Sequence, residues 1–248
     1  MTLPTLADWL VPDWAPHARV RALVTTRHGE HTPPPRHGFN LGANCGDEPA
    51  LVEQARLHVH RLLGTDHPPA WLEQVHGIDI IDAELGGGRA DGAWTRDSGR
   101  PCVVLTADCL PVLLARTDGS AVAALHAGWR GLLDGILEAG VAQLAPGGEP
   151  VSAWIGPAIS QARYQVGGEV REHFVRRDPS AAQAFVADSV PGRWRMNLAR
   201  LAEARLAAAG VVDITGGDHC TVTEEALFYS YRRDGTTGRF ATLIWLLS

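Results

Sequence analysis

The sequence predicts an α/β fold of the sandwich-like, α+β type, with mixed and antiparallel sheets flanked by helices. Three observations support this prediction. Apolar runs of strand length recur along the chain, segments with helical spacing separate them, and no internal repeat or low-complexity linker divides the 248 residues. We therefore expect one domain that covers residues 1–248.

The first half of the chain predicts strands, one long loop and one helix. Residues 19–26 (RVRALVTT) alternate well enough for a strand, and residues 28–46, rich in Gly, Pro and His, predict a long loop of the kind that often carries function. Residues 48–63 have helical spacing. Residues 71–81 predict two short strands or one strand broken at Gly77, and residues 102–107 predict another strand.

A β-hairpin is predicted around Asp118-Gly119, because this dipeptide lies between the apolar runs 111–115 and 121–125. With Asp118 and Gly119 as the two loop residues, Cys109 lies opposite Gly128. His126 then becomes a diagonal neighbour of Cys109, with about 7–8 Å between their backbones. This inference depends on the register, since a slip by one residue would place the two side chains on opposite faces.

The second half of the chain again predicts alternating helices and strands. We expect a helix from about Gly131 to Pro146, a strand at 151–155, a helix at 169–176 and a helix at 198–209 closed by Gly210. The apolar run at 240–247 suits a terminal core strand and is too short to span a membrane.

Composition narrows the class of function. The chain is 45% hydrophobic and 20% charged, with a net charge of −6 and no basic run, which argues against nucleic-acid binding. The first residues lack a basic region followed by a long apolar stretch, so we expect neither a signal peptide nor a membrane span, and a cytoplasmic location. The four cysteines lack CxxC spacing and are predicted to be reduced thiols.

Three residues are candidates for a metal site: His76, Cys109 and His126. Each ends a strand-like run beside a turn former, and two imidazoles with one thiolate suffice for a catalytic zinc that keeps a fourth position open. Taken one at a time, these side chains are better explained as surface or core residues. Their spacing matches no compact zinc-finger pattern.

Several polar residues are candidates for binding an anion. The GWRG segment at 128–131 lies at a predicted strand-to-helix junction, where backbone N–H groups and Arg130 favour a phosphate. Asn40 and Arg56, with Arg232 and Arg233, are further candidates, although from these residues alone ordinary surface or capping roles explain them better.

The order of motifs resembles that of one known family. The motifs are HGFNLG (37–42), EQVHG (73–77), TADCLPV (106–112), HAGWRG (126–131), GPAI (156–159) and FYSYRRDG (228–235). Together they resemble the polyphenol oxidase or laccase-domain family, whose members are described as purine nucleoside phosphorylases with adenosine deaminase activity. The resemblance runs from about Thr25 to the C-terminus.

This resemblance implies a zinc site made by His76, Cys109 and His126, which serve as metal ligands and as the catalytic centre. It implies phosphorolysis of adenosine, inosine and methylthioadenosine, with phosphate as co-substrate, and hydrolytic deamination of adenosine. Asn40, Arg56 and Arg130 are the expected substrate-binding residues.

The chain departs from the family pattern at two places. The helix after the Asn-Leu-Gly loop carries Ala55-Arg56 where an asparagine-arginine pair is common, so only the arginine transfers. Val222 follows Cys220 where the family often has a second cysteine, which leaves a second thiol without a role.

Deamination also needs a group that moves protons, and Asp91 and Asp108 are the candidates, with turn formation as the alternative for both. A thiol hydrolase or amidase acting on cell-wall precursors, with Cys109 as nucleophile and His126 as base, is the alternative function. A structural zinc would require a fourth ligand, for which His37 or His219 would serve.

A copper polyphenol oxidase is disfavoured. Only His58-Val-His60 has the His-x-His form, and Met1 and Met196 are the only methionines that could provide an axial ligand. The sequence leaves open the preferred nucleoside, the arginine that binds phosphate, and whether the protein is a monomer or a small homo-oligomer.

Overall fold

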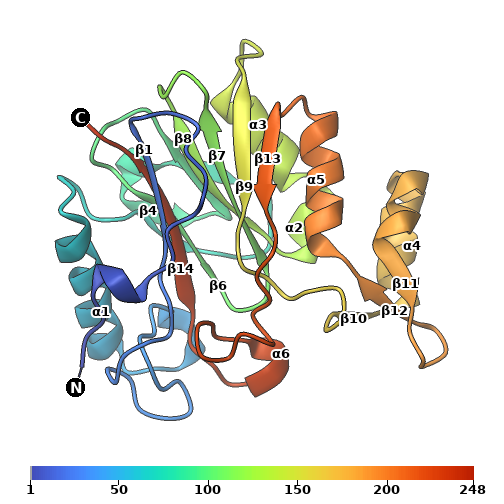
Figure 1. Ribbon diagram of the computed structural model, residues 1–248, viewed down its shortest axis with the longest axis horizontal. Helices are drawn as coiled ribbons and strands as arrows, with labels where there is room; N and C mark the ends of the chain where they lie inside the picture. Colours follow the sequence, from blue (N-terminus) through green and yellow to red (C-terminus); the bar gives the residue numbers. More distant parts are fainter. Residues whose placement is uncertain (1) are drawn as a thin grey trace.

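The computed structural model describes residues 2–248 and contains two stacked sheets with helices on both outer sides (Figure 1). The helices are α1 (Pro49–Leu63), α2 (Trp129–Asp134), α3 (Ile136–Leu144), α4 (Gly168–Arg177), α5 (Leu198–Ala208) and α6 (Tyr231–Asp234). The strands are β1 (Val20–Val24), β2 (Trp71–Glu73), β3 (Ile80–Asp82), β4 (Gly87–Arg89), β5 (Gly92–Thr95), β6 (Cys102–Thr106), β7 (Leu110–Arg116), β8 (Val122–Ala127), β9 (Val151–Ile155), β10 (Gln165–Gly167), β11 (Phe185–Ala187), β12 (Arg193–Met196), β13 (Asp213–Gly216) and β14 (Phe240–Leu246).

The larger sheet has six strands in the order β13-β9-β7-β8-β5-β3 and is mixed, because β13 pairs with β9 and β3 with β5 in parallel. The smaller sheet is antiparallel, in the order β1-β14-β6. One apolar cluster fills the space between the two sheets, a second joins the larger sheet to α2, α3 and α5, and a third joins the smaller sheet to α1. The prediction of an α/β sandwich with mixed and antiparallel sheets is therefore confirmed.

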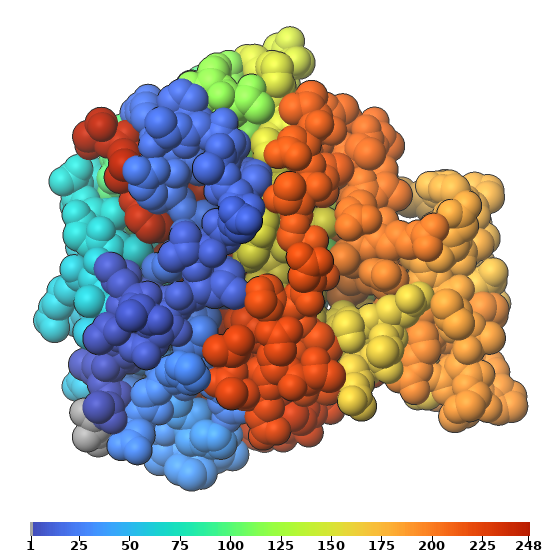
Figure 2. Space-filling model, viewed as in Figure 1, coloured from blue at the N-terminus to red at the C-terminus, as the bar shows by residue number. Residues whose placement is uncertain are grey.

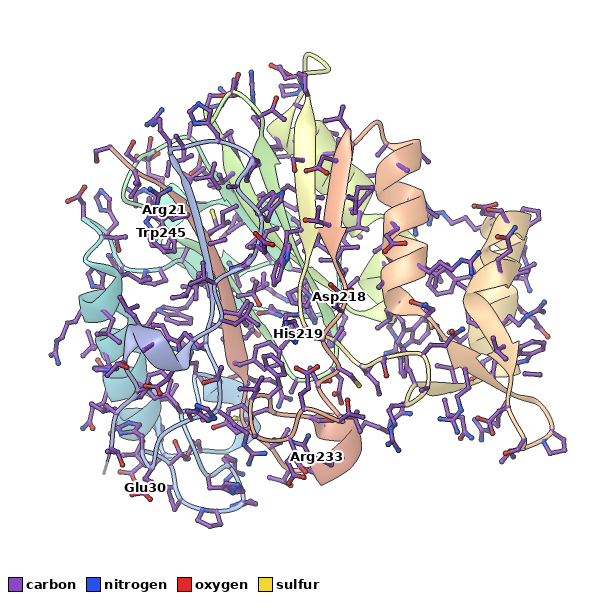
Figure 3. The ribbon with its side chains drawn as sticks, in the orientation of Figure 1. Arg21, Glu30, Asp218, His219, Arg233 and Trp245 are labelled. Carbon is purple, nitrogen blue, oxygen red and sulfur yellow. The ribbon has the colours of Figure 1, made fainter. Side chains whose placement is uncertain are left out.

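Strand β7 shows why this arrangement follows from the sequence. Val112 and Leu114 face the helices, whereas Leu113 and Ala115 face the smaller sheet, and all four side chains are fully buried. A strand covered on both faces needs apolar residues at every position, which explains its unbroken apolar run. The pairing of Arg21 with Trp245, labelled in Figure 3, lies at the outer face of the smaller sheet.

The predicted hairpin forms with the predicted register. Val112 pairs with Leu125 and Leu110 with Ala127, so β7 and β8 place the position of Cys109 opposite Gly128. Gly119 adopts a positive φ of 68° at the turn, where its N–H donates to the carbonyl of Arg116.

The helix expected from about Gly131 to Pro146 is wrong as a single element. The chain instead forms α2 and α3, separated by Gly135 at φ 116°. The break leaves the carbonyl groups at the end of α2 without helical partners, and the guanidinium of Arg205 donates to the carbonyl oxygens of Leu132 and Leu133. The compensating arginine lies on α5, far away in sequence, so local spacing could not reveal the break.

The other predicted helices and strands are confirmed, with residues 71–81 forming the two short strands β2 and β3. The short strands of the third sheet, β10-β12-β11, were not predicted. With α4 they make a lobe on one side of the molecule (Figure 2). In residues 2–248, no helix is both long and apolar enough to cross a membrane.

Candidate metal centre and cavity

His76, Cys109 and His126 meet at one end of the larger sheet. Their ligand atoms all lie within 4.8 Å of one another, and the Sγ of Cys109 is 3.7 Å from Nε2 of His76. Cys109 directly precedes β7, His126 lies in β8, and His76 lies in the loop after β2. The expected closeness of Cys109 and His126 is confirmed. The hairpin register provides two of the three groups, and a segment 33 residues before Cys109 provides the third.

Asp91 orients both histidines. Its fully buried carboxylate accepts a hydrogen bond of 2.8 Å from Nδ1 of His126 and bonds of 2.7 to 3.1 Å from the backbone N–H groups of Val75, His76 and Gly77. A partner at Nδ1 leaves Nε2 of His126 free to ligate a metal. Asp91 therefore fixes both the tautomer of His126 and the conformation of the loop that carries His76.

Two residues of the site have backbone conformations that are rare for residues other than glycine. His76 has φ 62° and Asp108, the residue before Cys109, has φ 102°. Asp91 holds the first, while the Asp108 carboxylate accepts from Oγ1 of Thr221 and from the backbone N–H of Arg232, both at 2.6 Å. Such strain persists only where surrounding contacts fix the backbone, and it gathers at functional sites.

The charges of the cluster favour a thiolate. Burial raises the pKa of Cys109, but the charge of His126 and hydrogen bonds from His126 and His76 outweigh it, so the pKa is lowered. For His126 the signs are reversed: burial lowers its pKa, but the charges of Cys109 and Asp91 and the hydrogen bonds to them outweigh burial, so the pKa is raised. A thiolate and two imidazoles form a donor set that can hold a divalent metal ion.

Gly128 gives the ligands room. A Cβ atom at this position would lie 2.8 Å from the His76 ring and 3.2 Å from Sγ of Cys109. At Gly131, a Cβ atom would lie 2.8 Å from the carbonyl oxygen of Gly77, in the loop that carries His76. The glycines of the GWRG segment thus allow α2 to approach the candidate metal ligands closely.

A cavity of about 970 Å³ opens onto the cluster. Four arginines line it: Arg56, Arg130, Arg232 and Arg239. Three of them lie over aromatic rings of the same wall, with Arg56 4.5 Å from the Trp71 centroid, Arg130 4.4 Å from Trp129 and Arg232 5.2 Å from Tyr164. Cationic and aromatic groups in one concave site suit a ligand with an anion and a planar ring.

Of the expected substrate-binding residues, Arg56 and Arg130 line the cavity, whereas Asn40 is not among the lining residues. Asn40 is fully buried, and its side-chain oxygen accepts from the backbone N–H groups of Gly42 and Arg239 at 2.9 and 2.8 Å. Its amide donates to Asp47 at 2.7 Å. Asn40 shapes the loop behind the cavity through these internal bonds.

Other sequence candidates lie elsewhere. Arg233, labelled on α6 in Figure 3, donates to the carbonyl oxygens of Thr221 and Phe228 and does not line the cavity. His219 bonds to Glu224 at 2.7 Å, and His37 contacts Arg27. Within residues 2–248, neither histidine belongs to the His76 cluster, so neither completes a closed four-ligand site.

Among the residues of the cavity wall that sequence reasoning missed are Trp71, Tyr164, Tyr231 and Arg239. Tyr231 lies inside the FYSYRRDG motif, which could have pointed to it. The other three lie in unremarkable sequence. Only the packing of distant segments brings them together.

Comparisons with known proteins agree with this architecture. A family model described as multi-copper polyphenol oxidoreductase laccase matches residues 21–247. A Pseudomonas aeruginosa protein named purine nucleoside phosphorylase is 47% identical over 96% of this chain and 98% of its own length. Purine nucleoside phosphorylase YfiH from Escherichia coli is 45% identical over 98% of this chain and 100% of its own length.

Solved structures give the same picture. A Neisseria meningitidis protein superposes with a TM-score of 0.92 at 41% identity, covering 97% of this chain and all of that one. YlmD from Geobacillus stearothermophilus superposes with a TM-score of 0.89 at 30% identity, covering 100% of this chain and 99% of that one. The chain therefore belongs to the multi-copper polyphenol oxidoreductase laccase family, in which its curated relatives are named purine nucleoside phosphorylases.

Proposed function

We propose that this protein is a zinc-dependent purine nucleoside phosphorylase that acts on adenosine, inosine and methylthioadenosine and also deaminates adenosine. The observation that carries the proposal is the His76, Cys109 and His126 cluster on the wall of a cavity lined by arginine and aromatic side chains. Zinc is the metal that two imidazoles, one thiolate and an open fourth position suit best. The relatives' names support the nucleoside as substrate.

In phosphorolysis, an oxygen of phosphate bonds to C1′ of the ribose while the C1′–N9 bond breaks. The electron pair of that bond goes to the purine, which takes up a proton. We assign the binding of phosphate to Arg130, which lies four residues after His126, and the stacking of the purine to the aromatic wall. Zinc, when bound, supplies a Lewis acid at this wall.

Deamination exchanges the amino group at C6 of adenosine for a water oxygen and releases ammonia. Of the two carboxylates expected to move protons, Asp91 is occupied by four donors, and we assign it to positioning. Asp108 lines the cavity beside Cys109 and accepts from two donors rather than four, so it is the group that we assign to proton transfer.

The test incubates metal-analysed protein with adenosine and phosphate, alongside His76→Ala and Cys109→Ala, and separates the products by chromatography. We expect adenine with ribose 1-phosphate, and inosine, from the zinc-loaded protein and from neither variant. Absence of turnover in protein that holds zinc would refute the proposal.

A thiol hydrolase or amidase acting on cell-wall precursors is the second candidate. The lowered pKa of Cys109 beside His126 favours it, since a thiolate next to an imidazole is an activated nucleophile. A chelator separates the two functions: it should abolish turnover by a zinc enzyme and leave a thiol hydrolase active.

We do not propose a copper oxidase despite the description of the family model. His58 and His60 donate from Nε2 to different backbone carbonyl oxygens, those of Pro4 and Thr65, and Met196 is fully buried. Met1 lies outside the described residues. We propose that the protein works in the cytoplasm, which its four free cysteines support.

A further inference from the structure

Besides Arg130 and Arg232, two further arginines line the cavity wall, Arg56 and Arg239. We call these two the second cationic pair. Neither guanidinium takes part in an ion pair within residues 2–248, and both are half-buried. Nε of Arg56 donates to the carbonyl oxygen of Leu41 at 3.0 Å, and Arg239 donates to the carbonyl oxygens of Thr237 and Gly238. Their positive charges therefore have dipoles as partners but no carboxylate.

The metal end of the cavity has its own arginines. Arg130 follows His126 by four residues, and the backbone N–H of Arg232 donates to Asp108, the neighbour of Cys109. Burial raises the pKa of Tyr164, as do the charges of Cys109 and Asp108, while Arg232 and Arg130 oppose the rise. These charged groups therefore act on one side chain of the cavity wall, that of Tyr164, over whose ring Arg232 lies at 5.2 Å.

Arg56 and Arg239 surround a different point, the loop that contains Gly42 and Cys45. A Cβ atom on Gly42 would lie 2.7 Å from Cγ of Arg239 and 3.2 Å from Sγ of Cys45, and Nε of Arg56 donates to the carbonyl oxygen of Leu41, the residue before Gly42. Trp71, beneath Arg56, precedes His76 by five residues. At about 3.3 Å per residue of extended chain, at most about 16 Å separates them, so one elongated ligand can reach both points.

Burying the second cationic pair costs hydration free energy, which a bound anion would offset. Burial lowers the pKa of Arg56, because a guanidinium removed from water loses hydration. The cavity wall holds four arginines and two carboxylates, Glu73 and Asp108, although the whole chain has a net charge of −6. One inorganic phosphate at the metal end leaves this second pair without an anion.

We propose that Arg56 and Arg239 bind a phosphate monoester carried on the ribose of the substrate, so that purine nucleoside monophosphates are ligands of the cavity. This proposal rests on the proposed function, because it places the base and C1′ at the metal end. Phosphorolysis of adenosine 5′-monophosphate would join an oxygen of inorganic phosphate to C1′ and break the C1′–N9 bond. The products would be adenine, whose N9 takes up one proton, and ribose 1,5-bisphosphate.

The test measures binding to the zinc-loaded protein by calorimetry, with adenosine, adenosine 5′-monophosphate and inorganic phosphate titrated separately. We expect the monophosphate to bind at least about tenfold more tightly than adenosine, as one or two charge-assisted hydrogen bonds should provide. Arg56→Gln and Arg239→Gln should each reduce this ratio several-fold. Circular dichroism verifies that each variant is folded.

Arg171→Gln is the matched control. Arg171 also lies over a tryptophan, 4.2 Å from the Trp194 centroid, but it is not among the residues that line the cavity. This control should keep the affinity ratio of the parent protein. A ratio that falls equally in all three variants would overturn the proposal.

Two further outcomes separate this proposal from the proposed function. If Arg56→Gln weakens binding of inorganic phosphate and leaves the ratio unchanged, the pair holds the co-substrate and the proposal is overturned. If the ratio is large and falls in Arg56→Gln, but no nucleoside is turned over, the subsite is supported and the phosphorylase is refuted. Release of ribose 1,5-bisphosphate would support both.

Discussion

The two ends of the cavity are built in different ways. At the metal end, Cys109 and His126 come from one hairpin whose register a turn dipeptide sets, and α2 follows directly. At the other end, Arg56, Trp71 and Arg239 come from a helix, a short strand and the segment before β14. A hairpin places its residues through local pairing, whereas the far wall exists only after the whole chain has folded.

This difference predicts where substitutions act. Changes near the hairpin should alter metal binding, and changes at the far wall should alter ligand binding without removing the metal.

Asp91→Asn should weaken zinc binding most, by about 100-fold. The amide cannot accept from four donors as the carboxylate does, so both the His126 tautomer and the His76 loop lose their support. Zinc affinity is measured by competition with a chromogenic chelator. Asp79→Asn, at an exposed position close in sequence, is the control and should bind zinc normally. Parental affinity in Asp91→Asn would show that the ligands do not depend on this carboxylate.

Arg130→Gln should raise the Michaelis constant for phosphate by about 30-fold, which corresponds to about 2 kcal/mol for a lost charge-assisted contact. The zinc content should stay that of the parent, because Arg130 is not a ligand. Arg176→Gln, an exposed change on α4, provides the comparison. An unchanged Michaelis constant would show that Arg130 does not bind phosphate, and it would contradict the assignment of phosphate to the metal end of the cavity.

Gly128→Ala should weaken zinc binding by about tenfold, because its Cβ atom would press on the His76 ring and on Sγ of Cys109. Gly168→Ala is a suitable control, since a Cβ atom there meets nothing closer than 3.5 Å. Chelator competition again gives the affinity. Equal affinities in the two variants would mean that α2 can move away from the ligands without penalty.

Asp118→Ala, at the turn of the same hairpin, should have the smallest effect, a loss of about 0.5 kcal/mol in the free energy of unfolding at pH 7. Hydrogen bonds from Ser120 and the charge and hydrogen bond of Arg116 outweigh burial and lower the pKa of Asp118 to about 2. The carboxylate is 53% exposed, which limits its contribution.

The pH dependence of this effect has a defined sign. Because the folded pKa is lower than the unfolded value of about 3.9, the contribution is complete well above pH 4 and disappears as the pH falls towards 2. Urea unfolding of parent and variant at pH 7 and at pH 3 measures it. A difference that grows at the lower pH would contradict this assignment, and zinc binding should be unaffected at neutral pH.

Much of the fold follows from local patterns. Apolar runs without polar interruptions identify strands buried on both faces, and the Asp118-Gly119 turn sets the register that brings Cys109 towards His126. The break at Gly135 was not predictable, since the arginine that supports it lies on α5. Short strands such as β10 and β11 also escape sequence analysis, because three residues carry too little periodicity.

The candidate site divides in the same way. The residues alone gave His76, Cys109 and His126 as a possible set, and the resemblance of the motifs made them the expected zinc ligands. The structure adds Asp91 as the group that joins both histidines, and it assigns Asn40 to internal hydrogen bonds. Hydrogen bonds between segments leave no periodic trace in a sequence, which is why these roles could not be anticipated.

By itself, the sequence determined the fold class, the hairpin and its register, because neighbouring residues and turn chemistry specify them, and the resemblance of its motifs implied the three metal ligands. Only the tertiary structure decided that Asp91 holds both His126 and the loop of His76, and that Arg56 and Arg239 share a cavity with the three candidate ligands. The physical reason is that these contacts join segments far apart in the chain, and their geometry is set by the packing of two sheets and their helices.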